Sequence, residues 1–133
     1  MKQLLPVLLI FISSICMAQV PVDLAANFVG KTIEVCGKVT RVDFGITVEN
    51  NTASQRTTLY FGSKNDIVLV ADLPKWDAET TQINFNDNMK LERSRYLDST
   101  VCVTGIVTLR NIPTLANGMP HIVVNSRDSI RYK

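Results

Sequence analysis

Histidine, tryptophan and cysteine are scarce in this sequence. It contains one histidine, one tryptophan and three cysteines among 133 residues, and aromatic residues make up only 7% of it. A single histidine excludes a zinc site built from several histidines, and a serine nucleophile would need that one histidine as its base. No Gly-x-Ser-x-Gly turn occurs. We therefore predict that the protein is not an enzyme and has no catalytic residues.

A strong charge of one sign is also lacking. The 14 basic and 12 acidic side chains leave a formal net charge of +2, which is too small to predict nucleic-acid binding from charge alone. Hydrophobic residues make up 46% and charged residues 20% of the chain, and these values exclude a disordered, collagen-like or coiled-coil protein. The length allows one globular domain but not two.

Residues 1–18 have the composition of a secretory signal peptide. Lys2 supplies the positive charge, an apolar run covers Leu4–Ile12, and Ala18 is a small residue at the cleavage position. The apolar run is too short to span a membrane comfortably. We expect cleavage after Ala18, a single domain over residues 19–133, no transmembrane segment in the mature chain, and export to the periplasm or the medium.

Two cysteines remain after this cleavage, an even number in an oxidising compartment. Cys36 and Cys102 both lie in strand-like runs, Val35-Cys36-Gly37 and Val101-Cys102-Val103. A disulfide between them would close a long loop. Two separate buried thiols fit the sequence equally well, because it does not show whether the two runs are neighbours in space.

Alternating apolar residues predict an all-β protein. The five main strands expected are Thr32–Val42, Asp43–Glu49, Arg56–Gly62, Thr100–Arg110 and His121–Asn125; Ile67–Ala71 is a short additional strand, and Asp128–Tyr132 is an extension of the last one. Gly37 and Gly105 lie in the middle of long strands, where glycine is typical of a bulge or a tight bend. A small, strongly bent barrel with a helix before its fourth strand is the plan of the OB fold. We therefore predict a five-stranded OB-fold Greek-key barrel with a minor helix between strands three and four.

The helical signals are weaker than the strand signals. Pro21–Phe28 has apolar residues at helical spacing, with Asp23 as its expected cap and Gly30 at its end. Met89–Leu97 predicts a short helix with a solvated face formed by Lys90, Glu92, Arg93 and Arg95. The remaining segments are expected to be polar loops and a hairpin turn: Asn50–Gln55, Asp72–Asn88 and Asn117-Gly118.

Five stretches taken in order carry a family resemblance: Leu24–Lys31, Val35–Val39, Thr58–Gly62, Val101–Ile106 and Pro120–Val124. Their order and spacing resemble those of small exported bacterial OB-fold domains, of the kind also found beside extracellular nucleases. The resemblance implies nucleic-acid binding by analogy of fold. The chain departs from the family pattern at an asparagine-rich insert around Thr80–Asn88 and at Pro113–Asn117. A second exported OB family, periplasmic proteins proposed to bind small cationic ligands, has a similar layout but lacks the Val-Cys-Gly pattern.

An OB barrel binds single-stranded nucleic acid across its second and third β-strands, by means of stacking aromatic side chains and a basic groove. Tyr60 alternates with Leu59 and Phe61 onto the opposite face, which makes it the candidate stacking platform. Trp76 is a second candidate aromatic. The stronger interpretation of the two residues is that Trp76 plugs one end of the barrel and that Tyr60 is an isolated surface aromatic. The candidate ligand-binding residues are Tyr60, Arg56, Arg41, Lys64, Trp76 and Arg110.

Metal ligands are few in this chain. Cys36, Cys102 and His121 offer only three zinc ligands and lack the close spacing of a zinc site. Asn84–Asn88 has the composition of a calcium loop, but Met89 stands where such a loop requires glycine. We interpret His121 as a half-buried strand residue rather than a catalytic base. No metal and no cofactor are predicted.

These patterns favour an exported, non-catalytic OB-fold binding module; if its ligand is nucleic acid, we expect a single strand that is bound weakly. A basic stripe around Tyr60 would favour this function. The alternative is a structural or protein-interaction domain, or a small-ligand binder, with no role in nucleic-acid binding. An exposed apolar patch would favour a protein partner, and a pocket with converging carboxylates would favour an enzyme.

Overall fold

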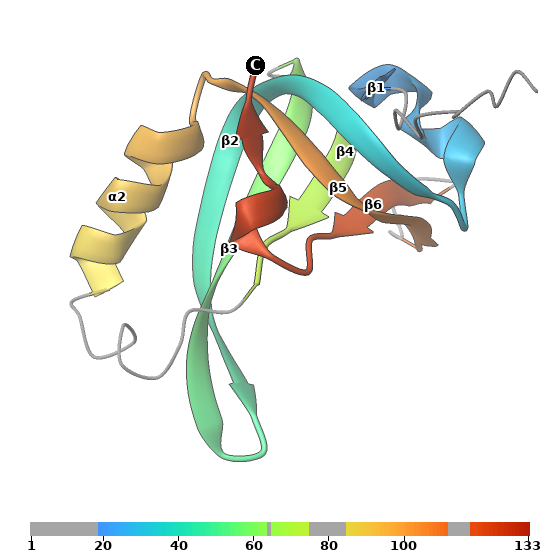
Figure 1. Ribbon diagram of the computed structural model, residues 1–133. Coiled ribbons are helices and arrows are strands. Elements are labelled where there is room, and N and C mark those ends of the chain that lie inside the picture. The colour runs from blue at the N-terminus through green and yellow to red at the C-terminus, as the bar shows by residue number, and fades with distance from the viewer. Residues whose placement is uncertain (1–18, 64, 75–84, 112–117) are drawn as a thin grey trace, which may run out of the picture.

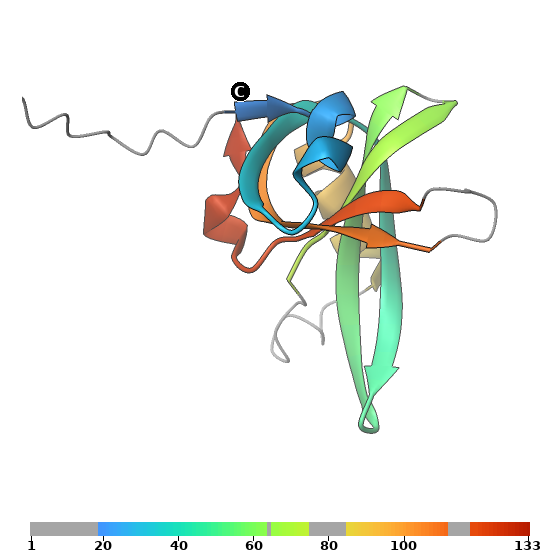
Figure 2. The same cartoon turned by 90° about the vertical axis from the view of Figure 1, so that its right-hand side faces the viewer.

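Five strands close into a barrel (Figures 1 and 2). They are β2 (Thr32–Glu49), β3 (Thr52–Ser63), β4 (Asp66–Asp72), β5 (Thr100–Arg110) and β6 (Met119–Val123). Their order is β2-β3-β4-β6-β5, and pairing of β2 with β5 closes the barrel. The computed structural model describes residues 19–63, 65–74, 85–111 and 118–133. The prediction of an all-β, OB-like barrel with one minor helix is confirmed, whereas the predicted signal peptide lies outside the described residues.

The core forms because apolar side chains alternate along the strands. In β3 the residues from Gln55 to Phe61 alternate between buried and half-buried, so that Leu59 and Phe61 point inward while Thr58 and Tyr60 point outward, as predicted. The completely buried apolar side chains come from all five barrel strands: Val35, Val39, Leu59, Phe61, Leu69, Ala71, Val101, Val103, Val107 and Ile122.

Strand β2 is longer than its sequence indicates. It runs without a break over 18 residues, where we expected two strands that meet near Asp43. It pairs with β3 as far as Glu49 and Thr52, and Asn50 and Asn51 turn the chain with φ of 51° and 62°. Part of the expected loop Asn50–Gln55 is therefore strand. The ends of β2 and β3 form a two-stranded arm, residues 43–58, which extends beyond the barrel (Figure 1).

The two mid-strand glycines permit close packing. The shift in register between β2 and β3 lies between Val39 and Arg41, so the bulge predicted at Gly37 is displaced along the strand. At Gly37 an added Cβ would collide with the side chain of Val22. At Gly105 it would lie 2.6 Å from the carbonyl oxygen of Val123. Both glycines therefore allow a neighbouring segment to approach the strand closely.

Short elements flank the barrel. At the N-terminal side are β1 (Gln19–Pro21), which lies parallel to β2, and the 3₁₀ helix η1 (Val22–Phe28). Pro21 occupies the N-cap of η1 without a side-chain cap, so the capping role expected of Asp23 is wrong. At the C-terminal side are η2 (Arg127–Ser129) and β7 (Arg131–Tyr132), which pairs with β5.

The boundaries near the C-terminus and around the helix differ from those expected. Strand β6 begins at Met119, earlier than expected, and the extension predicted after it consists of η2 and β7. Helix α2 covers Phe85–Tyr96, so it begins four residues before the predicted start at Met89. The hairpin turn predicted at Asn117 and most of the asparagine-rich insert fall on residues that the structure does not describe. No described helix is both long and apolar enough to cross a membrane.

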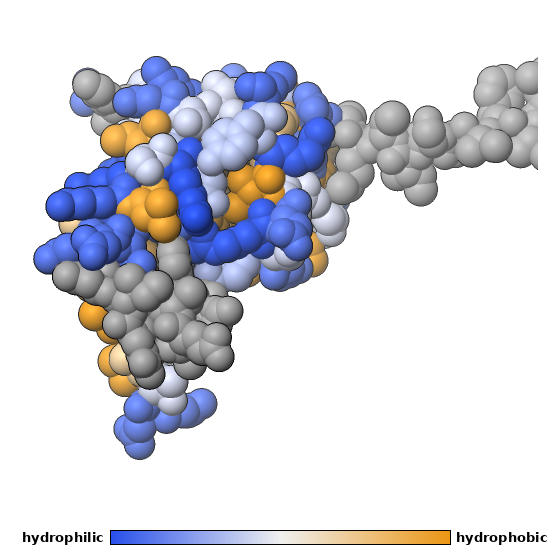
Figure 3. Space-filling view, turned by 60° about the vertical axis from the view of Figure 1, so that its left-hand side comes forward, coloured by the Kyte–Doolittle hydropathy of each residue, from blue (hydrophilic) through white to orange (hydrophobic). Residues whose placement is uncertain are grey.

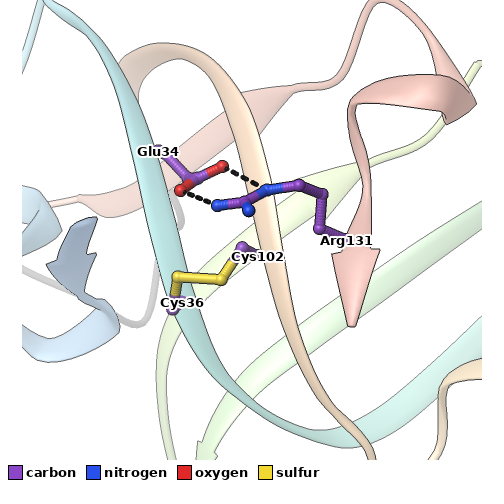
Figure 4. The surroundings of a disulfide bond; sticks show 4 residues. All are labelled: Glu34, Cys36, Cys102 and Arg131. Carbon is purple, nitrogen blue, oxygen red and sulfur yellow. Dashed lines mark hydrogen bonds and ion pairs between the residues drawn. A yellow bond between two sulfur atoms is a disulfide. The ribbon is translucent and has the colours of Figure 1, made fainter. Parts of the chain in front are cut away.

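Cys36 and Cys102 form a disulfide bond (Figure 4). They are direct partners in the antiparallel pairing of β2 with β5, with their Cα atoms 4.0 Å apart. The cysteines alternate with core valines, so the bond lies on the outer face of the barrel. There Glu34 accepts two hydrogen bonds from the guanidinium of Arg131, whose Nε lies 3.0 Å from the carboxylate, and both cysteines are buried. The disulfide is thus confirmed and the alternative of two separate thiols is wrong.

Removal of this bond should destabilise the barrel. The cysteines are 66 residues apart, and a loop of this length corresponds to about 4 kcal/mol in the loop-entropy model. We expect the double variant Cys36→Ala/Cys102→Ala to lose roughly that much free energy of unfolding in urea titrations. Addition of a thiol reductant should lower the stability of the wild type and leave the double variant unchanged. Equal unfolding midpoints for the oxidised wild type and the double variant would contradict the prediction.

Candidate functional site

A pocket of about 410 Å³ lies where the arm meets helix α2. Its walls come from three elements. Strand β2 contributes consecutive residues, strand β3 contributes alternate residues of its outer face, and α2 contributes two residues one turn apart. The lining residues are Asp43, Phe44, Gly45, Ile46, Arg56, Thr58, Tyr60, Met89 and Arg93.

The pairing of β2 with β3 determines which side chains meet here. Asp43 pairs with Thr58, and Gly45 pairs with Arg56, so these residues share the outer face of the arm. Gly45 has no side chain, and a Cβ added to it would meet no atom within 4 Å. The space beside the Arg56 side chain is therefore open, which leaves room for a ligand.

Arg41 and Tyr60 form a cation–π pair on this face, which we call the Arg41–Tyr60 platform. The guanidinium carbon of Arg41 lies 4.9 Å from the centre of the Tyr60 ring. Asp43 fixes the guanidinium by accepting hydrogen bonds from its Nε and Nη2, each at 2.9 Å. The Arg41 side chain is 62% exposed, so the outer side of its planar group faces solvent. Planar guanidinium groups and aromatic rings are both surfaces on which nucleobases stack.

The environment of Tyr60 keeps its hydroxyl neutral. Burial raises the pKa of this phenol, and the nearby carboxylate of Asp43 raises it further. Since the usual pKa of tyrosine is already near 10, the ring carries no negative charge at neutral pH. The platform therefore does not repel an anionic ligand.

Two arginines of the pocket have no carboxylate partner within the described parts of the chain, namely Arg56 on β3 and Arg93 on α2. The Nε atom of Arg56 is buried and makes no hydrogen bond. In contrast, the charge of Arg41 is balanced by Asp43. The pocket therefore has a local excess of positive charge that the small net charge of the chain does not reveal.

Arg110 is part of a second network beside the pocket. Its Nη2 lies 2.9 Å from Oδ2 of Asp72, in an ion pair whose angle is not that of a hydrogen bond. Asp72 also accepts a hydrogen bond of 3.3 Å from Thr58. The charge of Arg110 is thus neutralised, and its network joins the outer faces of β3, β4 and β5.

A buried carboxylate holds helix α2 against the barrel. Glu92 is completely buried and accepts a 2.8 Å hydrogen bond from Thr57 on β3. It also accepts hydrogen bonds from Arg127 at 3.1 Å and from Arg95 at 3.3 Å. One turn earlier, Asn88 donates a buried hydrogen bond to Gln55. The prediction that Glu92 lies on a solvated face is therefore wrong, because this helix packs through polar groups.

The structure brings four of the six candidate residues to one face. Tyr60 and Arg56 line the pocket, Arg41 stacks on Tyr60, and Arg110 lies in the adjoining network. Lys64 and Trp76 lie outside the described residues. We did not predict from the sequence that Met89, Arg93 and Asp43 line the pocket. The four-residue spacing of Met89 and Arg93 was a usable signal, because it places both on one side of a helix.

The remaining polar candidates give no catalytic or metal centre within the described chain. His121 is buried in β6, more deeply than we expected, and its Nδ1 lies 3.1 Å from the carbonyl oxygen of Met119. The only described cluster of potential metal ligands is Glu34 with Cys36 and Cys102. Both sulfur atoms of this cluster are bonded to each other, and the carboxylate is paired with Arg131.

The surface on the side of α2 is mixed in character (Figure 3). In its coloured parts, hydrophobic side chains form small separate patches between hydrophilic ones. A polar ligand suits such a surface better than a broad apolar partner does. A scan against protein-family models and a search of the curated proteins return no match for this chain. The assignment of the site therefore rests on its geometry.

The Glu92 network should make a large contribution to stability. Glu92→Gln removes a buried charge and leaves the guanidinium of Arg127 without its carboxylate, so we expect a loss of about 3 kcal/mol in the free energy of unfolding. Urea unfolding followed by circular dichroism measures it. Asp66→Asn is the control, since Asp66 is exposed and has no ion pair within the described residues. Equal losses in the two variants would contradict this role of Glu92.

Proposed function

We propose that the protein is an exported, non-catalytic OB-fold binding module whose ligand is single-stranded nucleic acid, and that it is related to the exported OB-fold domains it resembles. The observation that carries the proposal is the Arg41–Tyr60 platform, which borders a pocket with two arginines that have no carboxylate partner among the described residues. Stacking surfaces and nearby cations are the two components of single-strand binding. Tyr60 and Arg56 lie on the outer face of β3, the second barrel strand, which belongs to the face that OB domains use for this purpose. Arg41 comes from β2 and Arg93 from α2.

The geometry favours single strands over duplexes. A stacking platform needs bases with exposed faces, and these are available only in an unpaired strand. The only described α-helix, α2, uses Asn88, Glu92 and Tyr96 to pack against the barrel, so it is not a free basic helix that could enter a groove. Because the net charge of the whole chain is only +2, few phosphates can be neutralised. Binding should accordingly be weak and should decrease with added salt.

Loss of the platform should weaken binding measurably. Tyr60→Ala removes the ring under the Arg41 guanidinium and should cost about 1–3 kcal/mol of binding free energy, the magnitude of one lost base stack. Fluorescence anisotropy with labelled single-stranded oligonucleotides at low salt measures the effect.

Two matched variants serve as controls for that experiment. Tyr60→Phe keeps the aromatic ring and should retain most of the affinity. Lys31→Gln removes one exposed positive charge between η1 and β2, away from the pocket, and should change affinity little. If the wild type binds no oligonucleotide at high micromolar concentration, the proposed function fails.

A protein partner is the second candidate function. Ile46 and Val48 are 57% and 70% exposed and alternate onto one face of the arm. An exposed apolar pair on a projecting hairpin favours contact with another protein. Absence of oligonucleotide binding would make this arm the better-supported site of interaction.

Export is part of the proposal, and the disulfide supports it, because such bonds persist in oxidising compartments. We expect the mature protein to begin at Gln19. N-terminal sequencing of protein recovered from the periplasm or medium of an expressing bacterium measures this. A mature chain that retains Met1, or a lipid attached to Cys16, would contradict the prediction.

A further inference from the structure

We propose that the pocket between the arm and α2 binds the terminal phosphate of a single strand, so that the module recognises phosphorylated ends. This inference rests on the proposed function and assigns a ligand group to its pocket. The Arg41–Tyr60 platform would hold a base, and Arg56 with Arg93 would hold the phosphate.

The first argument is the unsatisfied state of Arg56. Its Nε is buried without a hydrogen-bond partner. A buried donor that is left unpaired is costly, and in a native protein it calls for an acceptor. The side chain lines the pocket, so its guanidinium has hydrogen-bonding capacity left for a phosphate bound there; the buried Nε itself becomes accessible to the phosphate only if the side chain turns.

The second argument is that two arginines line one pocket from different elements. Arg56 comes from β3 and Arg93 from α2, and neither has a carboxylate partner in the described ranges. Two guanidinium groups offer donors suited to several oxygens of one phosphate. Thr58 does not compete for the anion, because its hydroxyl donates to Asp72.

The third argument is the position of the pocket relative to the platform. Tyr60, Thr58 and Arg56 follow one another along the outer face of β3, at intervals of about 7 Å. A strand that leaves the platform in this direction reaches the pocket, where α2 forms a wall with Met89 and Arg93. A nucleic-acid strand with its last base on the platform would therefore place its terminal phosphate near Arg56 and Arg93.

The charge of the ligand agrees with this placement. A terminal phosphate monoester carries about −1.5 to −2 at neutral pH, whereas an internal phosphodiester carries one negative charge. The pocket volume of about 410 Å³ lies in the range typical of sites for small molecules rather than extended grooves. The charges of Arg56 and Arg93 match one dianionic group, and the volume leaves room for the nucleotide that carries it.

The test is a competition experiment with the mature chain. A labelled single strand is displaced by unlabelled oligonucleotides of about eight nucleotides that carry a 5′-phosphate, a 3′-phosphate, or hydroxyls at both ends. We expect one of the phosphorylated forms to bind about tenfold more tightly than the hydroxyl form. Arg93→Gln and Arg56→Gln should each reduce that preference to about twofold or less, whereas Lys31→Gln should retain it.

The outcomes separate the two proposals. Equal binding of all three competitors overturns end recognition and leaves the proposed function standing. A preference that persists in both arginine variants also overturns it, because the phosphate is then recognised elsewhere. Failure of every oligonucleotide to bind overturns the proposed function together with this inference. Thermal unfolding of the variants verifies that they are folded, since Arg93 is exposed and its replacement should leave the fold intact.

Discussion

Closure of the barrel along β2 and β5 is the constraint on which the rest of the structure depends. The two strands come from distant parts of the chain, and their pairing is held covalently at one position by Cys36 and Cys102. Beyond this β2–β5 pairing, which we call the disulfide seam, strand β2 changes register against β3 near Val39 and continues into the arm. Because the same strand carries Asp43 and Gly45, the disulfide seam and the pocket belong to one continuous element. Loosening of the seam would therefore be transmitted to the pocket through the backbone of β2.

The buried carboxylate of Glu92 is the second constraint, because it fixes the position of helix α2 on the barrel. A fully buried charge is tolerated only when it is paired and hydrogen-bonded, and here β3, α2 and η2 each supply a donor. The polar contact of Asn88 with Gln55 adds directional restraint one turn away. Such contacts hold the helix in one orientation, whereas an apolar face could slide. Arg93 follows Glu92 directly, so the network fixes where this arginine enters the pocket.

Much of the fold follows from the alternation of apolar residues, which was sufficient to predict β5 at its observed bounds and the outward face of Tyr60. The length of β2 could not be predicted, because Asp43 and Gly45 resemble a break when their pairing partners on β3 are unknown. The polar packing of α2 was also hidden, since Glu92 has the pattern of a solvated residue unless the donors around it are known. Both features, the length of β2 and the polar packing of α2, depend on contacts between residues that are distant in the sequence. A local sequence pattern contains no information about such contacts.

The pocket shows why net charge is a poor guide to the ligands of this protein. Across the chain the basic and acidic side chains almost balance, and on the binding face Arg41 and Arg110 are each neutralised by an aspartate. What a ligand would meet at the pocket is set by pairing rather than by the count of residues, and among the described residues pairing leaves Arg56 and Arg93 without a carboxylate. A broad basic groove would bind any polyanion along its length. Two cations at the end of a stacking platform concentrate the attraction at one point, so selectivity should depend on the group that reaches that point.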